Sequence, residues 1–312
     1  MVNNLKDKKK GLLGGIQRFS TEDGPGIRTT VFLKGCPLSC KWCHNPELLS
    51  SDIDILYSLA KCIRCGECIK VCPVGAITGA EEDIHIDRDK CIHCGLCAEN
   101  CCSEALRAAG EHRSLEDLMN VLVRDKEFYD STGGGITLSG GEILAQAAYA
   151  KEIAEACKKY DLSVALDTSG FGDLEDFKEL AKLADTILFD IKSMDSMTHK
   201  ELTGVDMDVI RDNLRGLASD PENRRKIIIR LPMLKGINDQ PETAEKVCVL
   251  MNELGLQEAN ILPYHSMGVS KSRKLGNAPE EFETPEDGQL MKLEKIYKDH
   301  GIEISIMGKA ES

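Results

Sequence analysis

Three cysteines on one short stretch have the spacing to hold an iron–sulfur cluster with a free coordination position. Cys36, Cys40 and Cys43 form the segment CPLSCKWC, with the spacing C-x3-C-x2-C, directly after an apolar run at Thr29–Leu33. Three thiolates on a short loop can hold three irons of a four-iron cluster and leave the fourth iron open. An open metal position is typical of a reactive site, whereas a closed one is structural or transfers electrons. The spacing therefore predicts a cluster that binds a further ligand.

Two other interpretations of this stretch are open. His44 follows the third cysteine and can complete a zinc site. The letters CKWCH at Cys40–His44 also match a haem c attachment signature, which usually requires export. No apolar segment follows the lysines of Met1–Lys10, so we expect no secretory signal. Trp42 either packs in the core or shields a cluster and contacts its ligand.

A second set of cysteines predicts two closed clusters. The spacing C-x2-C-x2-C-x3-C occurs twice, and Pro73 follows the first run. This run is typical of bacterial ferredoxins, in which the fourth cysteine of each run binds the other cluster. Cys102 stands where the second run lacks its proline, so it is an alternative to Cys101. The predicted ligand sets are Cys62, Cys65, Cys68 and Cys101 for one cluster, and Cys91, Cys94, Cys97 and Cys72 for the other.

Cysteine content and charge limit the class of protein. The chain has 14 cysteines among 312 residues, more than a reducing cytoplasm keeps as disulfides. Its 39 basic and 52 acidic residues give a net charge of −13, unlike the basic footprint of a nucleic-acid-binding protein. No apolar run approaches the roughly 18 residues of a membrane span. We expect a cytoplasmic protein that binds neither nucleic acid nor membrane. Cys157 and Cys248, outside the motifs, are interpreted as core residues.

Strand-like and helical segments alternate through most of the chain. The strand-like runs are 29–33, 135–139, 162–167, 186–191, 227–231 (ending at Pro232) and 258–262. The helical runs are 143–160, 174–183, 207–217, 241–254 and 285–299. About six βα units predict a parallel sheet with helical crossovers. The sheet either closes fully or partly into a barrel or forms an open doubly wound sheet. In both architectures the chemistry lies at the carboxyl ends of the strands.

Composition divides the chain into three segments. Residues 11–54 begin the sheet and carry the three-cysteine loop. Residues 55–109 contain the repeated cysteine runs, and a repeat of this kind predicts two copies of one small unit. Residues 110–312 contain only two cysteines and continue the alternation of strands and helices.

These features resemble radical S-adenosylmethionine (SAM) enzymes. The three-cysteine motif with Trp42 carries the resemblance. Phe19–Cys43 (FSTEDGPGIRTTVFLKGCPLSCKWC), continuing into His44–Glu47 (HNPE), is similar to the narrower glycyl-radical-enzyme activating enzymes. The similarity continues through Ser139–Glu142 (SGGE), Asp167–Gly170 (DTSG), Asp190–Lys192 (DIK), Arg230 and Leu262–His265 (LPYH). Ile143 departs from the family, which often has proline there. The cysteine runs resemble a subset with a two-cluster ferredoxin-like insert.

The resemblance implies an α/β fold, a partial (β/α)6 radical-SAM barrel with an inserted bacterial-ferredoxin-like α+β domain. It implies three 4Fe-4S clusters, SAM and a monovalent cation. Family members cleave SAM reductively to methionine and a 5′-deoxyadenosyl radical. That radical removes a hydrogen atom from the Cα of one glycine in a partner glycyl radical enzyme. Flavodoxin or ferredoxin is the expected electron donor, and the chain is expected to be a monomer from an anaerobic setting.

The resemblance also assigns residues. Cys36, Cys40 and Cys43 hold the cluster that cleaves SAM. The predicted SAM contacts are Trp42, His44, Gly140, Gly141, Glu142, Asp167, Thr168, Asp190, Ile191, Lys192, Arg230 and His265. Asp167, Thr168 and Asp190 are also the implied cation site.

The residue types suit these roles, and each has a simpler alternative. Gly140 and Gly141 allow close backbone approach, but the segment also suits an ordinary strand-to-helix turn. Glu142 either accepts a hydrogen bond from the SAM amine or lies in a first helical turn. Asp190 and Lys192 interrupt an apolar strand, where buried charges need partners, unless the strand end is solvated.

Arg230 follows three isoleucines and is predicted to point toward a ligand or a carboxylate. His265 contacts ribose or adenine in the family interpretation and is a loop histidine otherwise.

Two further functions stay open from the sequence. One keeps radical SAM chemistry but acts on another protein or a small molecule. The other is an electron carrier with three clusters, which leaves the open three-cysteine motif and the long βα scaffold unexplained. Activating enzymes with the insert serve choline lyases, glycerol or diol dehydratases, arylacetate decarboxylases, sulfonate lyases and benzylsuccinate-type synthases. The sequence does not choose among these partners.

Overall fold

The main body of the protein is one long sheet. The structure is a computed structural model that describes residues 10–79 and 83–308. In these ranges a nine-stranded sheet has the order β13-β12-β11-β10-β9-β8-β2-β1-β7. Its strands are β1 (Lys10–Ser20), β2 (Arg28–Leu33), β7 (Glu111–Ser114), β8 (Gly135–Gly140), β9 (Ser163–Thr168), β10 (Thr186–Asp190), β11 (Ile227–Met233), β12 (Glu258–Pro263) and β13 (Glu303–Ile306). Of the residues used to expect no signal peptide, 1–9 lie outside the described part.

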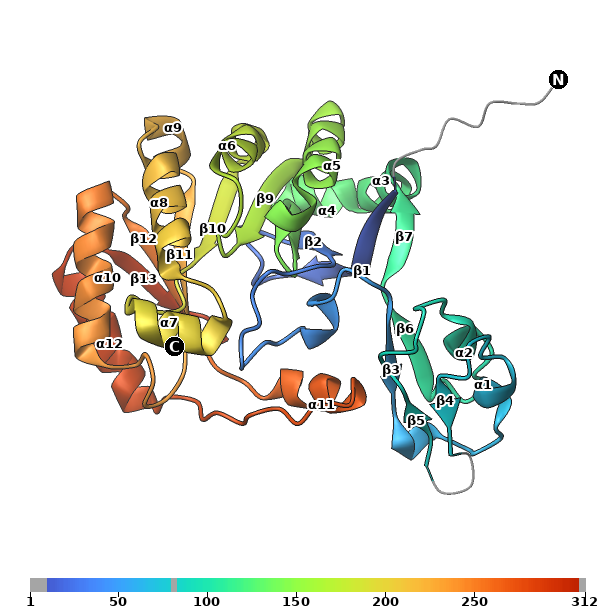
Figure 1. Cartoon of the computed structure of the whole chain (residues 1–312). Coiled ribbons are helices and arrows are strands. Elements are labelled where there is room, and N and C mark those ends of the chain that lie inside the picture. Colours follow the sequence, from blue (N-terminus) through green and yellow to red (C-terminus); the bar gives the residue numbers. More distant parts are fainter. Residues whose placement is uncertain (1–9, 80–82, 309–312) are drawn as a thin grey trace.

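The strand order decides between the two predicted architectures. From β2 the sheet continues in the order β8, β9, β10, β11, β12 and β13, and each of these strands pairs in parallel with the one before it. β7, which precedes β8 in the chain, pairs antiparallel with β1 on the other side. In a doubly wound sheet the order in which successive strands are added reverses at a switch point. The strand order from β2 to β13 shows no such reversal. The alternative of an open doubly wound sheet is therefore wrong. β7 and β13 are the two edges, so the sheet is open, and its strands fan out from one edge to the other (Figure 1).

Helices follow the parallel strands and cover the outer face of the sheet (Figure 1). The sheet domain contains α3 (Leu115–Leu122), α4 (Lys126–Thr132), α5 (Ala147–Lys159), α6 (Leu174–Leu183), α7 (Ser196–Thr203), α8 (Met207–Ala218), α9 (Pro221–Arg224), α10 (Pro241–Leu254), α11 (Met267–Lys274) and α12 (Asp287–Asp299). Short 3-10 turns occur at Pro46–Leu48, Val123–Asp125 and Ile143–Gln146. None of the described helices has the length and apolar character to cross a membrane.

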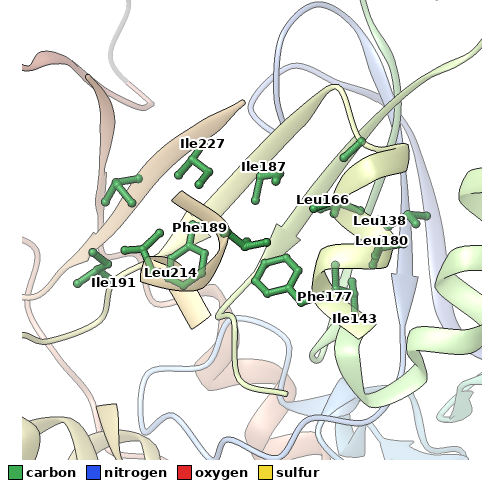
Figure 2. Close-up of a cluster of buried hydrophobic side chains, with 14 of the residues drawn as sticks. Leu138, Ile143, Leu166, Phe177, Leu180, Ile187, Phe189, Ile191, Leu214 and Ile227 are labelled. Atoms are coloured by element: carbon green, nitrogen blue, oxygen red, sulfur yellow. The ribbon is translucent and has the colours of Figure 1, made fainter. Parts of the chain in front are cut away.

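The core lies between the sheet and these helices. Leu166, Ile187 and Phe189 point from the strands toward Phe177 on α6 and Leu214 on α8 (Figure 2). Strands buried on one face by helices and on the other by the barrel interior read as near-continuous apolar runs, which explains why they were predictable. Cys157 and Cys248 are fully buried in this core, as expected.

The sheet is longer than predicted. β1, β7 and β13 were not expected, and β11 runs through Pro232 to Met233. β1 contains Gly14 and Gly15, which weaken a strand signal, and it is held by antiparallel pairing with β2 and β7. Pro232 is tolerated because it lies one residue from the end of β11, where few ladder bonds remain.

Residues 55–109, here called the insert, form a small separate unit beside β1 and β7 (Figure 1). Two antiparallel pairs build it: β3 (Asp54–Tyr57) with β6 (Leu106–Ala109), and β4 (Ile77–Thr78) with β5 (His85–Ile86). Two equivalent short helices, α1 (Glu67–Lys70) and α2 (Leu96–Glu99), each begin at a left-handed glycine. A turn at Leu59–Lys61 precedes α1. The unit has its own apolar cluster, made of Ile55, Ile77, Ile84, Cys97 and Leu106.

Candidate active site

The three-cysteine loop leaves the carboxyl end of β2 and is fastened on both sides. The amides of Gly35 and Cys36 donate to Leu48 O and Leu49 O, at 2.8 and 2.9 Å, which closes the loop on itself. The amides of Ser39 and Lys41 donate to the last residues of α7, at 2.8 and 3.0 Å. The cysteines therefore lie on a backbone whose shape is set by hydrogen bonds.

The three thiols are close together and poorly solvated. Burial is the main reason that the pKa of Cys36 and of Cys43 rises to about 12, and it also raises the pKa of Cys40. Cys40 lies near enough to Cys36 and Cys43 to perturb both electrostatically. Buried thiolates require positive partners, and a bound metal deprotonates its thiol ligands outright. The donor set fits a cluster with one uncapped iron.

Among the described residues, no three His, Cys, Asp or Glu side chains converge as the ligands of a single metal ion do. In a four-iron cluster each thiol binds a different iron, so the thiols stand further apart than around one ion. The zinc alternative with His44 gains no support, because the His44 ring instead stacks on His265 with centroids 3.7 Å apart.

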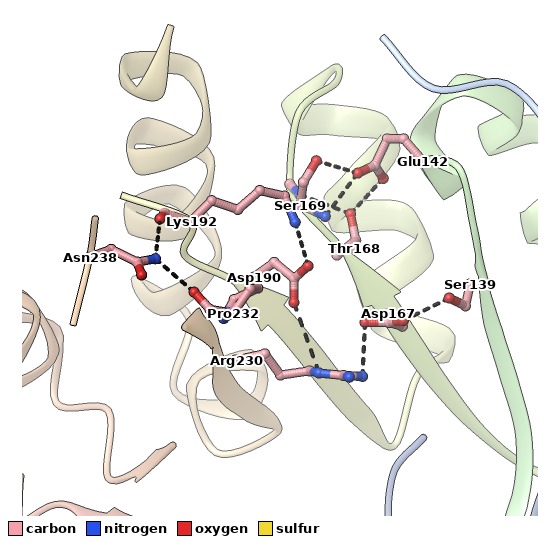
Figure 3. Close-up of polar contacts among 11 residues, drawn as sticks. Ser139, Glu142, Asp167, Thr168, Ser169, Asp190, Lys192, Arg230, Pro232 and Asn238 are labelled. Carbon is pink, nitrogen blue, oxygen red and sulfur yellow. Dashed lines mark hydrogen bonds and ion pairs between the residues drawn. The ribbon is translucent and has the colours of Figure 1, made fainter. Parts of the chain in front are cut away.

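Four charged side chains meet at the carboxyl ends of β9, β10 and β11 (Figure 3). Arg230 donates from Nη1 to Asp167 Oδ1 at 3.2 Å, and its Nε lies 3.9 Å from Asp190 Oδ1. Lys192 Nζ donates to Asp190 Oδ2 at 2.6 Å. The side chains of Lys192 and Arg230 are only 12% and 14% exposed. The prediction that Asp190 holds Lys192, and that Arg230 faces a carboxylate, is confirmed.

These charges determine the electrostatics next to the thiols. Burial by itself lowers the pKa of Lys192, but Asp190, Cys40 and Cys36 together raise it above its usual value. Burial likewise opposes the charge of Arg230, and Asp167 and Asp190 raise its pKa. Both cations stay charged, and Lys192 lies close enough to Cys36, Cys40 and Cys43 to favour their thiolate forms.

Glu142 is bound by the protein itself. Its buried carboxylate accepts from Thr168 Oγ1 at 2.5 Å, from Ser169 N and Oγ at 2.8 and 2.5 Å, and from Leu144 N at 3.1 Å (Figure 3). Burial raises the pKa of Glu142, and the bonds from Ser169 and Thr168 counter that rise. Glu142 is the N-cap of the 3-10 turn Ile143–Gln146 and does not lie in a first helical turn. Its contact with the SAM amine stays a prediction.

The two glycines before Glu142 are required by the chain itself. A Cβ on Gly140 would lie 2.0 Å from Leu33 O, and one on Gly141 would lie 2.3 Å from Gly35 O. Gly140 also has φ +129°. The sequence predicted a close approach of this backbone to a ligand. In the structure the two glycines instead allow close contact with Leu33 and Gly35, at the start of the cysteine loop.

An aromatic group flanks the loop on the side of β12. Trp42 is buried against Tyr264, and both rings contact Phe282 edge-on at about 6 Å. A cavity of about 300 Å³ lies between this group, the cysteine loop and α11, with Cys40, Trp42 and Cys43 in its wall. Ile191, a further predicted SAM contact, is not part of this aromatic group. Its side chain is buried in the main core, and its amide donates to Arg230 O at 2.8 Å.

Several buried polar atoms at this end of the sheet lack partners. His44 Nε2, Asp190 Oδ1 and Arg230 Nε make no hydrogen bond. Native interiors rarely leave such atoms unpaired, because each costs about 1–3 kcal/mol. Asp190 Oδ1 and Arg230 Nε face each other as an ion pair at 3.9 Å, and neither is hydrogen-bonded. Together with His44 Nε2, they fit a polar ligand that presents both donors and acceptors, as SAM does.

Comparison with known proteins agrees with this geometry. The family model of the radical SAM superfamily matches residues 30–247. The chain belongs to the radical SAM superfamily. Membership implies one 4Fe-4S cluster and SAM, which are the groups that the cysteine loop and the neighbouring polar residues fit.

Two curated relatives cover nearly the whole chain of this radical SAM protein. The choline trimethylamine-lyase activating enzyme of Oleidesulfovibrio alaskensis is 36% identical over 96% of this chain and 99% of its own. The trans-4-hydroxy-L-proline dehydratase activating enzyme of Clostridioides difficile is 39% identical, covering 95% and 99%. The prediction of a radical SAM activating enzyme is therefore confirmed.

A solved structure confirms the fold alone. The radical SAM methyltransferase from Sphaerobacter thermophilus superposes with a TM-score of 0.53 at 14% identity. The superposition covers 94% of this chain and 76% of the methyltransferase.

The structure places eight of the twelve predicted SAM contacts in two groups. Asp167, Thr168, Asp190, Lys192 and Arg230 meet at the strand ends. Trp42, His44 and His265 lie on the side of β12. The implied monovalent-cation site at Asp167, Thr168 and Asp190 stays a prediction, and Arg230 already brings a positive charge to both carboxylates.

Sequence reasoning missed two supports of the loop. Lys271 Nζ on α11 donates to Asn45 Oδ1 and Glu47 Oε1, both at 2.7 Å. Gly268 approaches so closely that a Cβ there would lie 2.1 Å from Cys43 O. The polar residues Asn45 and Glu47 in HNPE, next to the third cysteine, could have indicated the contact with a cation such as Lys271. The contact of Gly268 with Cys43 depends on how α11 packs and has no signal in the sequence.

His199 on α7 gives a pH prediction. Its Nδ1 faces Val205 O at 2.8 Å, so the proton lies there, and its buried Nε2 has no partner. Burial lowers the pKa of His199 below its usual value. The unfolded chain therefore binds the extra proton first, and stability falls as pH drops below about 6.5. We expect the free energy of unfolding of His199→Gln to fall less between pH 7.5 and 5.5 than that of wild type.

The matched control is His112→Gln, which removes an exposed histidine of β7. Urea denaturation of the anaerobic holoenzyme at both pH values measures the difference. Equal pH dependence in wild type and His199→Gln would contradict the assignment.

Proposed function

We propose that the protein is a glycyl-radical-enzyme activase. It cleaves SAM reductively to methionine and a 5′-deoxyadenosyl radical, which takes a hydrogen atom from one glycine Cα of a partner enzyme. The products are 5′-deoxyadenosine and a backbone glycyl radical. The observation that carries the proposal is the similarity, over at least 95% of the chain, to activating enzymes of two chemically different partners, a lyase and a dehydratase.

Residues at the strand ends are proposed to bind and orient SAM. When bound, the cluster on Cys36, Cys40 and Cys43 supplies the electron for cleavage. Lys192 is proposed to bind the SAM carboxylate or ribose, and the 2.6 Å bond from its ammonium to Asp190 supports this role. Asp190 itself keeps an unbonded Oδ1 for the ligand. No side chain acts as acid or base in this reaction, because the cofactors carry the chemistry and the protein orients them and excludes water.

The aromatic side of the site is proposed to hold the adenosyl end of SAM. His44 Nε2 is buried without a partner, and His265 presents an exposed ring stacked on His44. Trp42 is held by Tyr264 and Phe282 and shields the cysteine loop. A planar base with ring nitrogens suits a surface of stacked rings with one unpaired nitrogen.

Two further 4Fe-4S clusters are proposed in the insert. Cys68 lies near Cys62, Cys65 and Cys101, which is the predicted exchange of the fourth ligand between runs. Cys97 likewise lies near Cys91 and Cys94.

The fourth positions support Cys101 rather than Cys102. The amide of Ala76 donates to Cys72 Sγ at 3.2 Å, and the amide of Leu106 donates to Cys101 Sγ at 3.4 Å. The fourth cysteines of the two runs thus have equivalent surroundings.

The direct test is the formation of a glycyl radical. The reconstituted protein is incubated anaerobically with SAM, a reductant and a candidate partner that carries a C-terminal glycine-radical motif. We expect a doublet electron paramagnetic resonance signal, lost when the motif glycine of the partner is replaced by alanine, and one 5′-deoxyadenosine per radical. Release of 5′-deoxyadenosine with a small molecule, and no radical on any candidate partner, would favour the other radical SAM functions.

The insert clusters are proposed to carry electrons from flavodoxin or ferredoxin. We expect the double variant Cys65→Ser, Cys94→Ser to lose most SAM cleavage driven by reduced flavodoxin, because both steps of the relay are damaged. Cleavage driven by dithionite, which reduces the catalytic cluster directly, should persist. Cys102→Ser is the control that leaves both clusters complete. Undiminished turnover of the double variant with flavodoxin would refute the relay.

A further inference from the structure

Lys34 is a fully buried lysine at the point where the sheet domain, the cysteine loop and the insert meet. It follows β2 directly and stands two residues before Cys36. Its backbone is fixed on the sheet, because its amide donates to Leu12 O at 3.0 Å and its carbonyl accepts from Gln146 Nε2 at 2.7 Å. The side chain leaves the sheet and crosses toward the insert.

The ammonium of Lys34 links two segments. Nζ donates to Glu47 O at 2.6 Å, on the returning arm of the cysteine loop, and to Asp54 Oδ2 at 2.8 Å, at the first residue of β3. The Lys34 side chain is 0% exposed and that of Asp54 is 16% exposed. One cation therefore joins the loop that carries the reactive cysteines to the first strand of the insert.

The aliphatic stem of Lys34 contacts the other end of the insert. Gly110, the residue after β6, has φ +125°, and a Cβ there would lie 2.9 Å from Lys34 Cδ. Asp54 pairs with Ala109 in the β3–β6 ladder, so the chain enters and leaves the insert side by side. Both connections close around the same side chain.

A charge in this position is costly for stability alone. Taking a lysine and a carboxylate out of water costs several kcal/mol each, and an apolar pair of similar volume often serves stability as well. An ion pair with a defined geometry fixes one orientation between the groups that it joins, whereas an apolar contact tolerates several orientations. A neighbouring contact acts in the same direction, since His93 Nδ1 in the second cysteine run faces Ile53 O at 3.0 Å.

We propose that Lys34 is a positioning residue that holds the insert in one orientation relative to the SAM-cleaving cysteine loop. Through Asp54 it keeps the electron path from the insert to that loop short and constant. The consequence for electron delivery rests on the proposed function, whereas the mechanical role does not.

The first readout is amide hydrogen exchange of the anaerobic holoenzyme, measured without partner or turnover. In Lys34→Met we expect exchange of residues 54–57 and 106–109 to rise about tenfold while β8–β10 stay protected, because the root of the insert loosens locally. Asp54→Asn keeps the shape and lies on the insert side, so it should reproduce the change even if Lys34→Met folds poorly. Lys61→Met, which removes an exposed lysine of the insert, should leave exchange unchanged.

The second readout is the ratio of SAM cleavage driven by reduced flavodoxin to that driven by dithionite. We expect this ratio to fall about tenfold in Lys34→Met and in Asp54→Asn, with dithionite-driven cleavage preserved. The double variant should be no worse than either single variant, because the two changes break one interaction. The mechanical role is overturned if exchange at the root of the insert matches wild type in both single variants. The role in electron delivery is overturned if this ratio matches wild type in both. Failure of the glycyl-radical test leaves the exchange experiment valid.

Discussion

Replacing Cys40 with alanine is expected to reduce SAM cleavage to the level seen without protein. Cys40 is the middle thiol of the loop and perturbs both Cys36 and Cys43 electrostatically. With two thiols left on a buried loop, one iron loses its anchor and the cluster is not retained. Anaerobic reconstitution followed by quantification of 5′-deoxyadenosine measures the loss. If the two clusters proposed for the insert are present, the variant should still hold about two thirds of the wild-type iron.

Cys157→Ala is the matched control for this experiment. Cys157 is also a buried thiol, and burial raises its pKa to about 12, but it lies in the main core on α5. It should keep its iron and its SAM cleavage despite a small loss of packing. Cleavage of SAM by Cys40→Ala, or equal losses in the two variants, would contradict the assignment of the reactive cluster to this loop.

Replacing Arg230 with methionine is expected to destabilise the protein by about 3–5 kcal/mol. The change leaves Asp167 with Ser139 as its only remaining hydrogen-bond partner in the described structure, and it removes a positive charge from beside Asp190. Desolvation already raises the pKa of Asp167, and Arg230 is the main group that opposes this rise. Urea denaturation of the anaerobic holoenzyme measures the loss.

The pH dependence separates this effect from lost packing. Without Arg230 the folded-state pKa of Asp167 rises further above its unfolded value near 3.9, so the penalty is full at neutral pH and shrinks as the pH falls and the carboxyl is protonated. Arg230→Lys retains a cation and should lose less at pH 7. A Met variant whose loss is the same at pH 5 and pH 8 would point to packing rather than to an uncompensated charge.

Much of the site could be predicted because the residues that carry its chemistry lie close together in the sequence. The three reactive cysteines lie within eight residues, on a loop that β2 introduces, and their spacing indicates the cluster without knowledge of the fold. The βα alternation was readable for the same reason, since each buried strand is a short apolar run. Both signals depend on neighbours in the chain.

Other features depend on pairings between distant segments. The residues of β1 and β7 have only a weak strand pattern in the sequence. These segments are strands because β1 pairs antiparallel with both β2 and β7. Glu142 lies in a motif that is typical of ligand binding. However, β8 packs beside β9, and the Glu142 carboxylate therefore accepts hydrogen bonds from Thr168 and Ser169. No local pattern distinguishes these outcomes from the alternatives.

The order of residues identifies the groups that are able to bind metal and charge: the cysteine spacings, the DIK strand end and Arg230 after three isoleucines. Which of these groups meet depends on the fold. Arg230 reaches Asp167, 63 residues away, because β9, β10 and β11 lie in parallel register. Lys34 reaches Asp54 because the insert leaves the sheet beside β2. Ion pairs of this kind are formed by the register and packing of strands, and neither is encoded in the spacing of the residues along the chain.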